Sequence, residues 1–160
     1  MQTPIKLLVN GRLQPVDAPP TAFLLDVLRG RLGLNGSRYG CGLEQCGACK
    51  VLIDGVAEYS CSREIRTLQG RAVTTVEALG SPGRLHPLQQ AFVDEQAGQC
   101  GYCLSGILIA SKALLDSNPA PTRADVIAAL DPHLCRCGTH QRIIRAVLAA
   151  AAKLRQEAAA

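Results

Sequence analysis

Eight cysteines dominate the chemistry available to this chain of 160 residues, and they fall into two sets. The first set has the spacing C-x4-C-x2-C-x11-C and lies in the segment YGCGLEQCGACKVLIDGVAEYSC, residues 39–61. Four thiolates crowded into such a short stretch repel one another, so they require a compensating cation. The members of this set are Cys41, Cys46, Cys49 and Cys61.

The spacing of the first set indicates which cation it holds. Its first three cysteines match the plant-type [2Fe–2S] pattern, C-x4-C-x2-C with a more distant fourth cysteine. Gly40, Gly42 and Gly47 flank these positions and give the loop the freedom to approach a cluster closely. A zinc site commonly uses paired C-x2–4-C knuckles set further apart, and disulfides are a third alternative. The spacing favours the iron–sulfur cluster over both.

The second set consists of two short pairs, QCGYC and CRCGT. Each pair lies between two predicted helices, and helix N-termini near residues 104 and 139 would turn their positive ends toward a negative cluster. Spacing alone leaves zinc and a second [2Fe–2S] cluster nearly equal, and the first site favours the cluster. The members of this set are Cys100, Cys103, Cys135 and Cys137.

Composition narrows the class of protein. Hydrophobic residues make up 48% of the chain, so a core can be buried, but only 3% are aromatic. The net charge of +4 is diffuse, which argues against nucleic acid as a partner. The first residues do not resemble a signal peptide, and no apolar stretch has the length of a membrane span. We therefore expect a cytoplasmic protein with reduced thiols and no direct membrane insertion.

The N-terminal half is predicted to be a small β-grasp domain. Two hairpins turn at Asn10-Gly11 and Asp54-Gly55, and a last strand covers residues 71–76. One helix between the hairpins is predicted to be capped by Thr21 and to end at Gly33.

The C-terminal half is predicted to be helical. Residues 77–86 contain two glycines and a proline and are typical of a linker. A first helix begins at Pro87 and ends at Gly98, and Thr122 with Asp125 forms a capping box for the third of four helices. The predicted fold is α+β, with a ferredoxin-like domain over residues 1–76 and a helical [2Fe–2S]-binding domain over 87–160.

Four cysteine motifs occur along the chain in an order that resembles a known protein family. The motifs YGCGLEQCGAC, the distant Cys61, QCGYC and LCRCGT resemble those of the iron–sulfur subunits of molybdenum hydroxylases, the xanthine oxidase family. The resemblance covers residues 5 to about 150. It implies that the first cysteine set holds a cluster distal to molybdenum and that the second set holds a proximal one.

The resemblance also implies a cofactor and partners. Gln99 and Cys137 resemble the family positions that contact molybdopterin, which we expect in its cytosine dinucleotide form in a large partner subunit. The chain itself then carries no catalytic residue and passes electrons to a flavin subunit or a cytochrome c. Membrane association, if any, would come through such a partner.

Departures from the common family pattern indicate a subgroup. Leu104-Ser105-Gly106 stands where many members have Thr-Pro-Gly, His140 stands where Tyr is frequent, and Lys50 stands where Thr is common. These variants are most similar to nicotinate and isoquinoline oxidoreductases, which implies an N-heteroaromatic substrate. The alternatives are a subunit of an aldehyde-oxidising enzyme, a free-standing two-cluster carrier and a zinc-stabilised interaction module.

Histidine ligands are a weaker alternative for the second site. His133 and His140 flank the CRCGT pair, and a Rieske centre would use two histidines. Eight cysteines already fill two four-cysteine sites, so we expect hydrogen bonding near the cluster instead. His86 precedes a helix and is interpreted as a cap or a surface residue.

Overall fold

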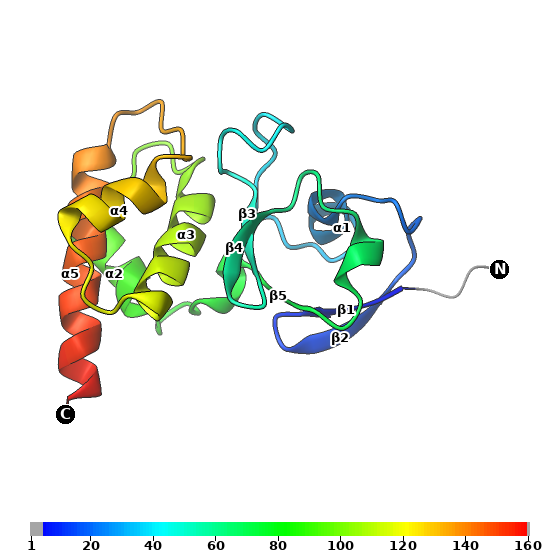
Figure 1. Cartoon of the computed structure of the whole chain (residues 1–160), viewed down its shortest axis with the longest axis horizontal. Coiled ribbons are helices and arrows are strands. Elements are labelled where there is room, and N and C mark those ends of the chain that lie inside the picture. Colours follow the sequence, from blue (N-terminus) through cyan, green and yellow to red (C-terminus); the bar gives the residue numbers. More distant parts are fainter. Residues whose placement is uncertain (1–4, 160) are drawn as a thin grey trace.

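The computed structural model describes residues 5–159, and their N-terminal half forms a five-stranded mixed sheet (Figure 1). The strand order is β2-β1-β5-β3-β4, with β1 parallel to β5 and the other neighbours antiparallel. The helix α1, Leu24–Gly30, buries its apolar face in the same core as the sheet. This arrangement confirms the predicted β-grasp. The strands are β1 Ile5–Val9, β2 Arg12–Val16, β3 Lys50–Ile53, β4 Val56–Tyr59 and β5 Ala72–Thr74.

Both predicted hairpins are confirmed, and their turns have a common geometry. Asn10 and Gly11 have φ of 51° and 73°, and Asp54 and Gly55 have φ of 50° and 84°. Two successive residues with positive φ are the requirement of a type I′ turn, whose twist matches that of the flanking strands. The second hairpin carries the chain from Cys49 out and back to Cys61.

The predicted boundaries of α1 are wrong at both ends. The helix begins at Leu24, and Phe23 occupies the N-cap without a side-chain hydrogen bond. The backbone N–H groups of Leu24 and Leu25 donate instead to the carbonyls of Arg63 and Ser60. Tertiary contacts therefore satisfy the first turn, and no hydroxyl of Thr21 is needed. The helix ends at Gly30, three residues before Gly33.

The last strand is shorter than the predicted 71–76. It covers Ala72–Thr74, and the chain then turns into a short 3-10 helix, η2, at Val76–Ala78. Another 3-10 helix, η1, covers Ile65–Leu68 beneath the sheet, where Ile65 and Leu68 are fully buried.

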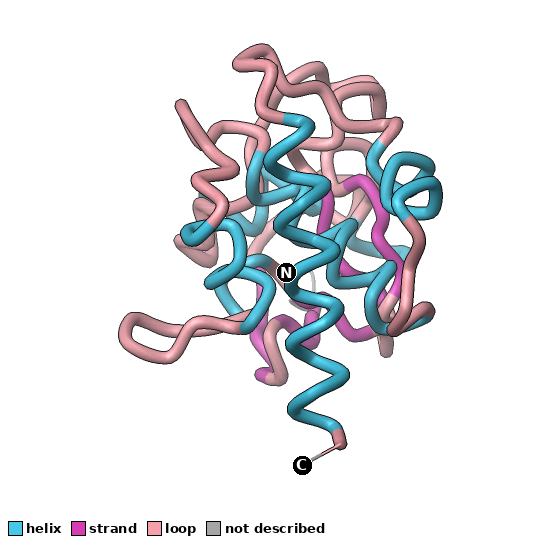
Figure 2. The backbone as a smooth tube through the Cα atoms, turned by 90° about the vertical axis from the view of Figure 1, so that its left-hand side faces the viewer, coloured by secondary structure: helices cyan, strands magenta, loops and turns pink. Residues whose placement is uncertain are grey.

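Four helices form the C-terminal half, as predicted, around a second and separate hydrophobic core. Figure 2 views the molecule from this end, with the long last helix running across the face. Buried leucine, isoleucine, valine and alanine side chains from all four helices fill the core. The helices are α2 Pro87–Asp94, α3 Leu104–Ser117, α4 Arg123–Leu130 and α5 His140–Ala158.

Capping signals in this half are confirmed, with one exception. Thr122 and Asp125 form the predicted capping box of α4, and His86 caps α2 ahead of Pro87. The exception is the end of α2, which lies at Asp94 rather than at Gly98. Gln96, with φ of 47°, takes the left-handed position that ends the helix.

The loops that carry the cysteines lie at the same end of the molecule. Figure 1 shows the cyan loop before β3 and the loops before α3 and α5 along its upper edge. The two halves of the chain thus bring segments that are far apart in the sequence to one edge. Among residues 5–159, no helix combines the length and the apolar character needed to cross a membrane.

Candidate metal centres

The first cysteine set is held in a loop whose backbone N–H groups point at sulfur. Leu43 and Gln45 each donate to Sγ of Cys41 over 3.3 Å, and the N–H of Cys41 donates to Sγ of Cys46 over 3.4 Å. Hydrogen bonds of this kind stabilise a thiolate relative to a thiol. The loop is therefore arranged for negatively charged sulfur before any metal is considered.

Glycine is required where this loop approaches its own sulfur atoms. A Cβ added to Gly40 would lie 2.6 Å from Sγ of Cys46, closer than van der Waals contact allows. Gly47 has a φ of +75°, and its Cβ would meet the ring of His133 at 2.4 Å. Gly40 and Gly47 thus allow the close approach that was predicted for the glycines of this loop.

The other two thiols of the first set, those of Cys49 and Cys61, are buried within the N-terminal half. Cys49 and Cys61 are 2% and 6% exposed and share a small cluster with Leu25. The hydroxyl of Ser60 donates to the carbonyl of Cys49 over 2.6 Å and fixes the end of the hairpin. The hairpin brings the two thiols into one buried cluster.

The second set spans the starts of two helices. Cys103 is the N-cap residue of α3 and is buried, whereas Cys100 is exposed. Sγ of Cys135 lies 3.4 Å from Oγ1 of Thr139, the N-cap residue of α5. The prediction that helix N-termini follow each pair is confirmed, since α3 begins at Leu104 and α5 at His140.

In both sets the thiols lie in neighbouring pairs whose members affect each other's ionisation. Within residues 5–159, no three His, Cys, Asp or Glu side chains converge on the position of a single metal ion. Members of different pairs within a set also affect one another's charge, so the four thiols of each set lie in one neighbourhood. The pairs are Cys41 with Cys46, Cys49 with Cys61, Cys100 with Cys137, and Cys103 with Cys135.

Each set combines a thiol that ionises easily with one that resists ionisation. Burial opposes ionisation of Cys41, but the N–H groups of its loop lower its pKa to about 7. Burial, and then the charge of Cys49, raises the pKa of Cys61 to about 11. Four thiolates can therefore coexist at this site only when a cation compensates their charge.

The second set repeats this contrast. Burial opposes ionisation of Cys135, yet hydrogen bonds from Thr139 lower its pKa to about 7. Burial, followed by contact with Cys135, raises the pKa of Cys103 to about 12. Each set thus combines two neighbouring thiol pairs with a need for positive charge to compensate four thiolates. These features fit a [2Fe–2S] cluster, in which each iron takes two cysteine sulfurs.

The two cysteine loops are in direct contact at the backbone. The N–H of Leu134, next to Cys135, donates to the carbonyl of Cys46 over 3.1 Å. In the first turn of α3, Gly106 lies so close to Gly47 that an added Cβ would be 1.9 Å from the Gly47 oxygen. Cys46 of the first set is therefore one hydrogen bond away from Leu134, which directly precedes Cys135 of the second set.

Side chains reinforce this contact. The hydroxyl of Tyr102, between Cys100 and Cys103, donates to the carbonyl of Tyr39 at the start of the first loop. The guanidinium of Arg38 lies over the Tyr102 ring, 5.3 Å from its centroid. The hydroxyl of Ser105 donates to the carbonyl of Ala48 over 3.3 Å. The two loops are thus held in one fixed relation.

His133 lies in this contact, and it is not placed as a metal ligand. It is only 3% exposed, and burial, together with the charge of Lys50, lowers its pKa to about 4, so the imidazole is neutral. Both ring nitrogens are buried without a hydrogen-bond partner among the residues that the structure describes. The ring is held by packing against Gly47 instead.

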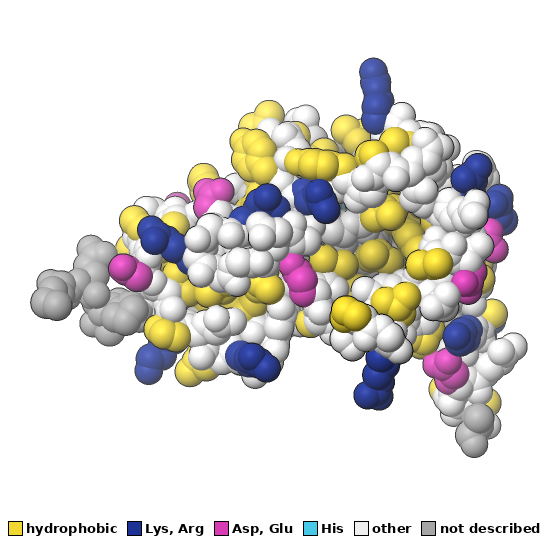
Figure 3. Space-filling model, turned by 180° about the vertical axis from the view of Figure 1, so that it is seen from behind, with side chains coloured by type: hydrophobic (Ala, Val, Ile, Leu, Met, Phe, Trp, Pro, Cys, Tyr) yellow, Lys and Arg dark blue, Asp and Glu magenta, His cyan; other side chains and the backbone are white. Residues whose placement is uncertain are grey.

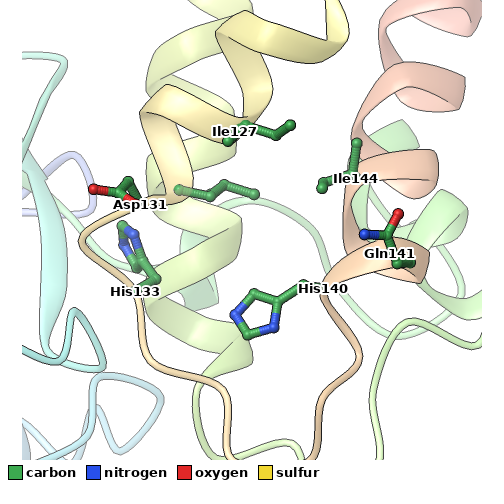
Figure 4. Close-up of a pocket in the computed structure, with 7 residues that line it drawn as sticks. Ile127, Asp131, His133, His140, Gln141 and Ile144 are labelled. Atoms are coloured by element: carbon green, nitrogen blue, oxygen red, sulfur yellow. The ribbon is translucent and has the colours of Figure 1, made fainter.

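The pocket between α4 and α5 contains both histidines that a Rieske site would use. Figure 4 shows His133 and His140 at the lower rim, Asp131 above His133, Gln141 beside His140, and Ile127 toward the top. The residues that line it include none of the cysteines. The structure therefore does not bring these imidazoles together with the thiols.

Gln99 is exposed beside the exposed Cys100. It lines a groove between α2 and α3 together with Phe92, Val93 and Arg142. Because α2 ends at Asp94, Gln99 lies in a loop and not at a helix end as predicted. Its side chain is accessible to a partner chain.

Apolar side chains surround the cysteine loops on the surface. Figure 3, seen from behind, shows them gathered along the upper edge, where Figure 1 places these loops. A large exposed apolar patch is typical of an interaction site. The most exposed of these side chains in the cysteine loops are Tyr39, Leu43, Tyr102 and Leu134, at 58%, 70%, 47% and 66%.

Sequence reasoning missed the residues that join the two loops. Gly106 and His133 carry no local signal of contact with Gly47, because the contact is between segments about sixty and ninety residues apart. Lys50 stands out in the sequence only as an unusual residue after CGAC. Its place over the Tyr59 ring follows from the register of the predicted hairpin, which pairs the two residues.

Comparison with known proteins agrees with this architecture. A family described as "2Fe-2S iron-sulfur cluster binding domain" matches residues 7–76, and one described as "[2Fe-2S] binding domain" matches residues 75–148. Both halves of the chain thus match cluster-binding domains.

Several proteins of known function are similar over nearly the whole chain. The A subunit of nicotinate dehydrogenase from Pseudomonas putida is 54% identical, covering 94% of this chain and 96% of its own length. The alpha subunit of isoquinoline 1-oxidoreductase from Brevundimonas diminuta is 46% identical, covering 92% of this chain and 97% of its own length. The aldehyde oxidoreductase structure from Desulfovibrio desulfuricans superposes with a TM-score of 0.93 at 41% identity. It covers 98% of this chain, which spans only 18% of that larger protein.

Proposed function

Because this chain belongs to the iron–sulfur subunits of the xanthine oxidase family of molybdenum hydroxylases, we propose that it carries electrons outward from the molybdopterin of a large partner subunit. The observation that most supports this proposal is the backbone hydrogen bond between Leu134 and Cys46, which joins the two cysteine loops. Electron tunnelling weakens steeply with distance, so two carriers in series must be held close together and at a fixed separation.

The proposed ligands are the eight cysteines in their two sets. Cys41, Cys46, Cys49 and Cys61 would hold the distal cluster, and Cys100, Cys103, Cys135 and Cys137 would hold the proximal one. Each bound [2Fe–2S] cluster supplies a site that accepts and releases one electron at a time. The proposed domain division, 1–76 and 87–160 with the linker 77–86, is supported by the two separate hydrophobic cores.

The exposure of the cysteines supports a direction for electron transfer through the chain. Cys100 is exposed, which suits a proximal site that meets the partner's pterin, expected in its cytosine dinucleotide form. Cys49 and Cys61 are buried, whereas Cys41 and Cys46 lie nearer the surface of the first loop. Electrons would therefore leave toward a flavin subunit or a cytochrome c on the side of the first loop.

The proposed substrate of the complex is an N-heteroaromatic compound such as nicotinate or isoquinoline. The relatives named for those compounds support this proposal, since their identity covers nearly all of both chains. An aldehyde substrate is the second candidate, supported by the similarity to the aldehyde oxidoreductase structure. The experiment is to express the chain together with its large subunit, then to follow cluster bleaching after adding nicotinate, isoquinoline or an aldehyde. A chain that purifies alone, without molybdenum, would contradict the proposal and favour a free-standing carrier.

Gln99 provides a test of the proposed pterin contact. Replacing Gln99 by Ala should leave iron content intact, because no ligand is lost, and should lower molybdenum occupancy or the rate of cluster reduction by substrate. One buried hydrogen bond is worth about 1–3 kcal/mol, or roughly ten- to a hundredfold in an equilibrium. Both quantities are measured on the complex with its large subunit.

Gln45 offers a matched control for this variant. It precedes Cys46 as Gln99 precedes Cys100, and its side chain is also exposed. Gln45→Ala keeps the backbone N–H that points at Cys41 and should change neither molybdenum occupancy nor the reduction rate. Equal behaviour of the two variants would return Gln99 to the role of a surface residue.

A further inference from the structure

Lys50 occupies a special position relative to the first cysteine set. It is the first residue of β3, directly after Cys49, and it pairs across the hairpin with Tyr59, two residues before Cys61. Its ammonium lies over the Tyr59 ring, 4.5 Å from the centroid. A cation in this geometry is attracted by the negative face of the ring and is held in place.

The charge of Lys50 is not neutralised by a neighbouring carboxylate. Lys50 takes part in none of the ion pairs found among residues 5–159. The side chain is half-buried, so water screens it less than a surface lysine. The Tyr59 ring beneath the ammonium packs against the buried cluster of Leu25, Cys49 and Cys61, so the charge of Lys50 is held beside two thiols of the first set.

The second cysteine set lacks an equivalent buried cation among the residues that the structure describes. Arg136 lies in its loop, between Cys135 and Cys137, with an exposed side chain. A second cation, Arg38, lies over the Tyr102 ring between Cys100 and Cys103. Arg38 is exposed, so solvent screens its charge. Lys50 directly follows a cysteine of the first set, whereas on the side of the second set its charge reaches His133, two residues from Cys135. The two proposed cluster sites therefore lie in unequal electrostatic surroundings, and the more favourable site for extra negative charge is the distal one.

We propose that Lys50 raises the reduction potential of the distal cluster relative to the proximal one, so that an electron entering from the partner comes to rest at the distal site. The proposal rests on the proposed function. Four thiolates and an oxidised two-iron, two-sulfide core carry a net charge of about −2. Transfer of one electron oxidises the proximal cluster and makes the distal one more negative by one unit. A nearby fixed ammonium stabilises that added charge.

The test is an anaerobic redox titration of the complex with its large subunit, followed by electron paramagnetic resonance. Lys50→Met keeps the length of the side chain and removes the charge. It should lower the distal potential by about 59 mV, a tenfold change in the one-electron equilibrium, and should shift the proximal potential by much less. Lys50→Arg, which keeps a cation over the ring, should stay near the wild-type value.

Control variants assign each electron paramagnetic resonance signal to a cluster and distinguish an effect of charge from an effect of packing. The distal signal is the one lost in Cys49→Ser. Arg38→Met removes the exposed cation and should move neither potential appreciably. Iron content is measured for each variant, and Lys50→Gln replaces Lys50→Met in the same titration if the methionine variant loses iron.

The outcomes are distinguishable from failure of the proposed function. Wild-type protein without iron would overturn the proposed function itself. Intact clusters with an unchanged distal potential in Lys50→Met would overturn only the role of Lys50. An equal drop in Lys50→Arg and Lys50→Met would also overturn it, because the effect would then come from packing rather than from charge.

Discussion

Replacing Gly106 by Ala should separate the two cysteine loops and destabilise the protein strongly. The added Cβ would lie 1.9 Å from the carbonyl oxygen of Gly47 and 2.8 Å from its carbonyl carbon. The obstructing atoms are backbone, so no side-chain rotation relieves the clash. Overpacking of this kind costs about 3 kcal/mol. At roughly 2–4 °C per kcal/mol for a chain of this size, the unfolding midpoint should fall by roughly 6–12 °C.

The magnetic interaction between the two reduced clusters shows whether the lost stability of Gly106→Ala comes from the contact between the cysteine loops. The hydrogen bond from Leu134 goes to Cys46, the neighbour of Gly47, so displacement of Gly47 by the added Cβ should also disturb it and weaken the magnetic interaction between the two reduced clusters. Gly30 is the matched control, because an added Cβ there meets nothing within 4 Å. Gly30→Ala should not lower the midpoint, since Ala reduces the freedom of the unfolded chain, and it should leave the interaction unchanged. Wild-type stability in Gly106→Ala would mean that the loops are not in backbone contact.

Replacing Cys49 by Ser should remove one of two electron paramagnetic resonance signals and leave the other. Cys49 is buried in a cluster with Leu25 and Cys61, whereas Cys103 belongs to the core of the helical half. Loss of a thiolate ligand from one set therefore leaves the scaffold of the other set intact. The expected loss is about two of four irons per chain, measured with the spectrum of the reduced protein.

The reciprocal variant completes this prediction. Cys103→Ser should remove the second signal and spare the first, since Cys103 contacts Cys135 and not the first set. Circular dichroism establishes that each variant remains folded. If both signals disappear in a folded Cys49→Ser protein, the assignment of the cysteines to two independent sites is wrong.

Local features of the fold could be predicted from the sequence because their causes are local. The Asn10-Gly11 and Asp54-Gly55 turns require positive φ at both residues, and these residue types tolerate it. The capping box of Thr122 and Asp125 uses side chains three residues apart. The ends of α1 could not be predicted, because Arg63 and Ser60 supply the acceptors for its first N–H groups from another part of the chain.

In the candidate sites, too, local features could be predicted and contacts between distant segments could not. Spacing grouped the cysteines into two sets, and the structure brings members of each set close enough to affect one another's ionisation. Contact between the sets depends on Gly106 and His133 against Gly47, which no spacing rule relates. The assignment of all eight cysteines as ligands and of Gln99 and Cys137 to the pterin stays a prediction.

Metal analysis of the chain, prepared anaerobically with its large subunit, tests the central proposal most directly. Two complete [2Fe–2S] sites predict four irons and four inorganic sulfides per chain, with two distinct signals after reduction. Substrate should produce these signals when molybdenum is present in the partner. Zinc in place of iron at either site, or iron that substrate never reduces in a molybdenum-loaded complex, would contradict a role in carrying electrons from molybdopterin.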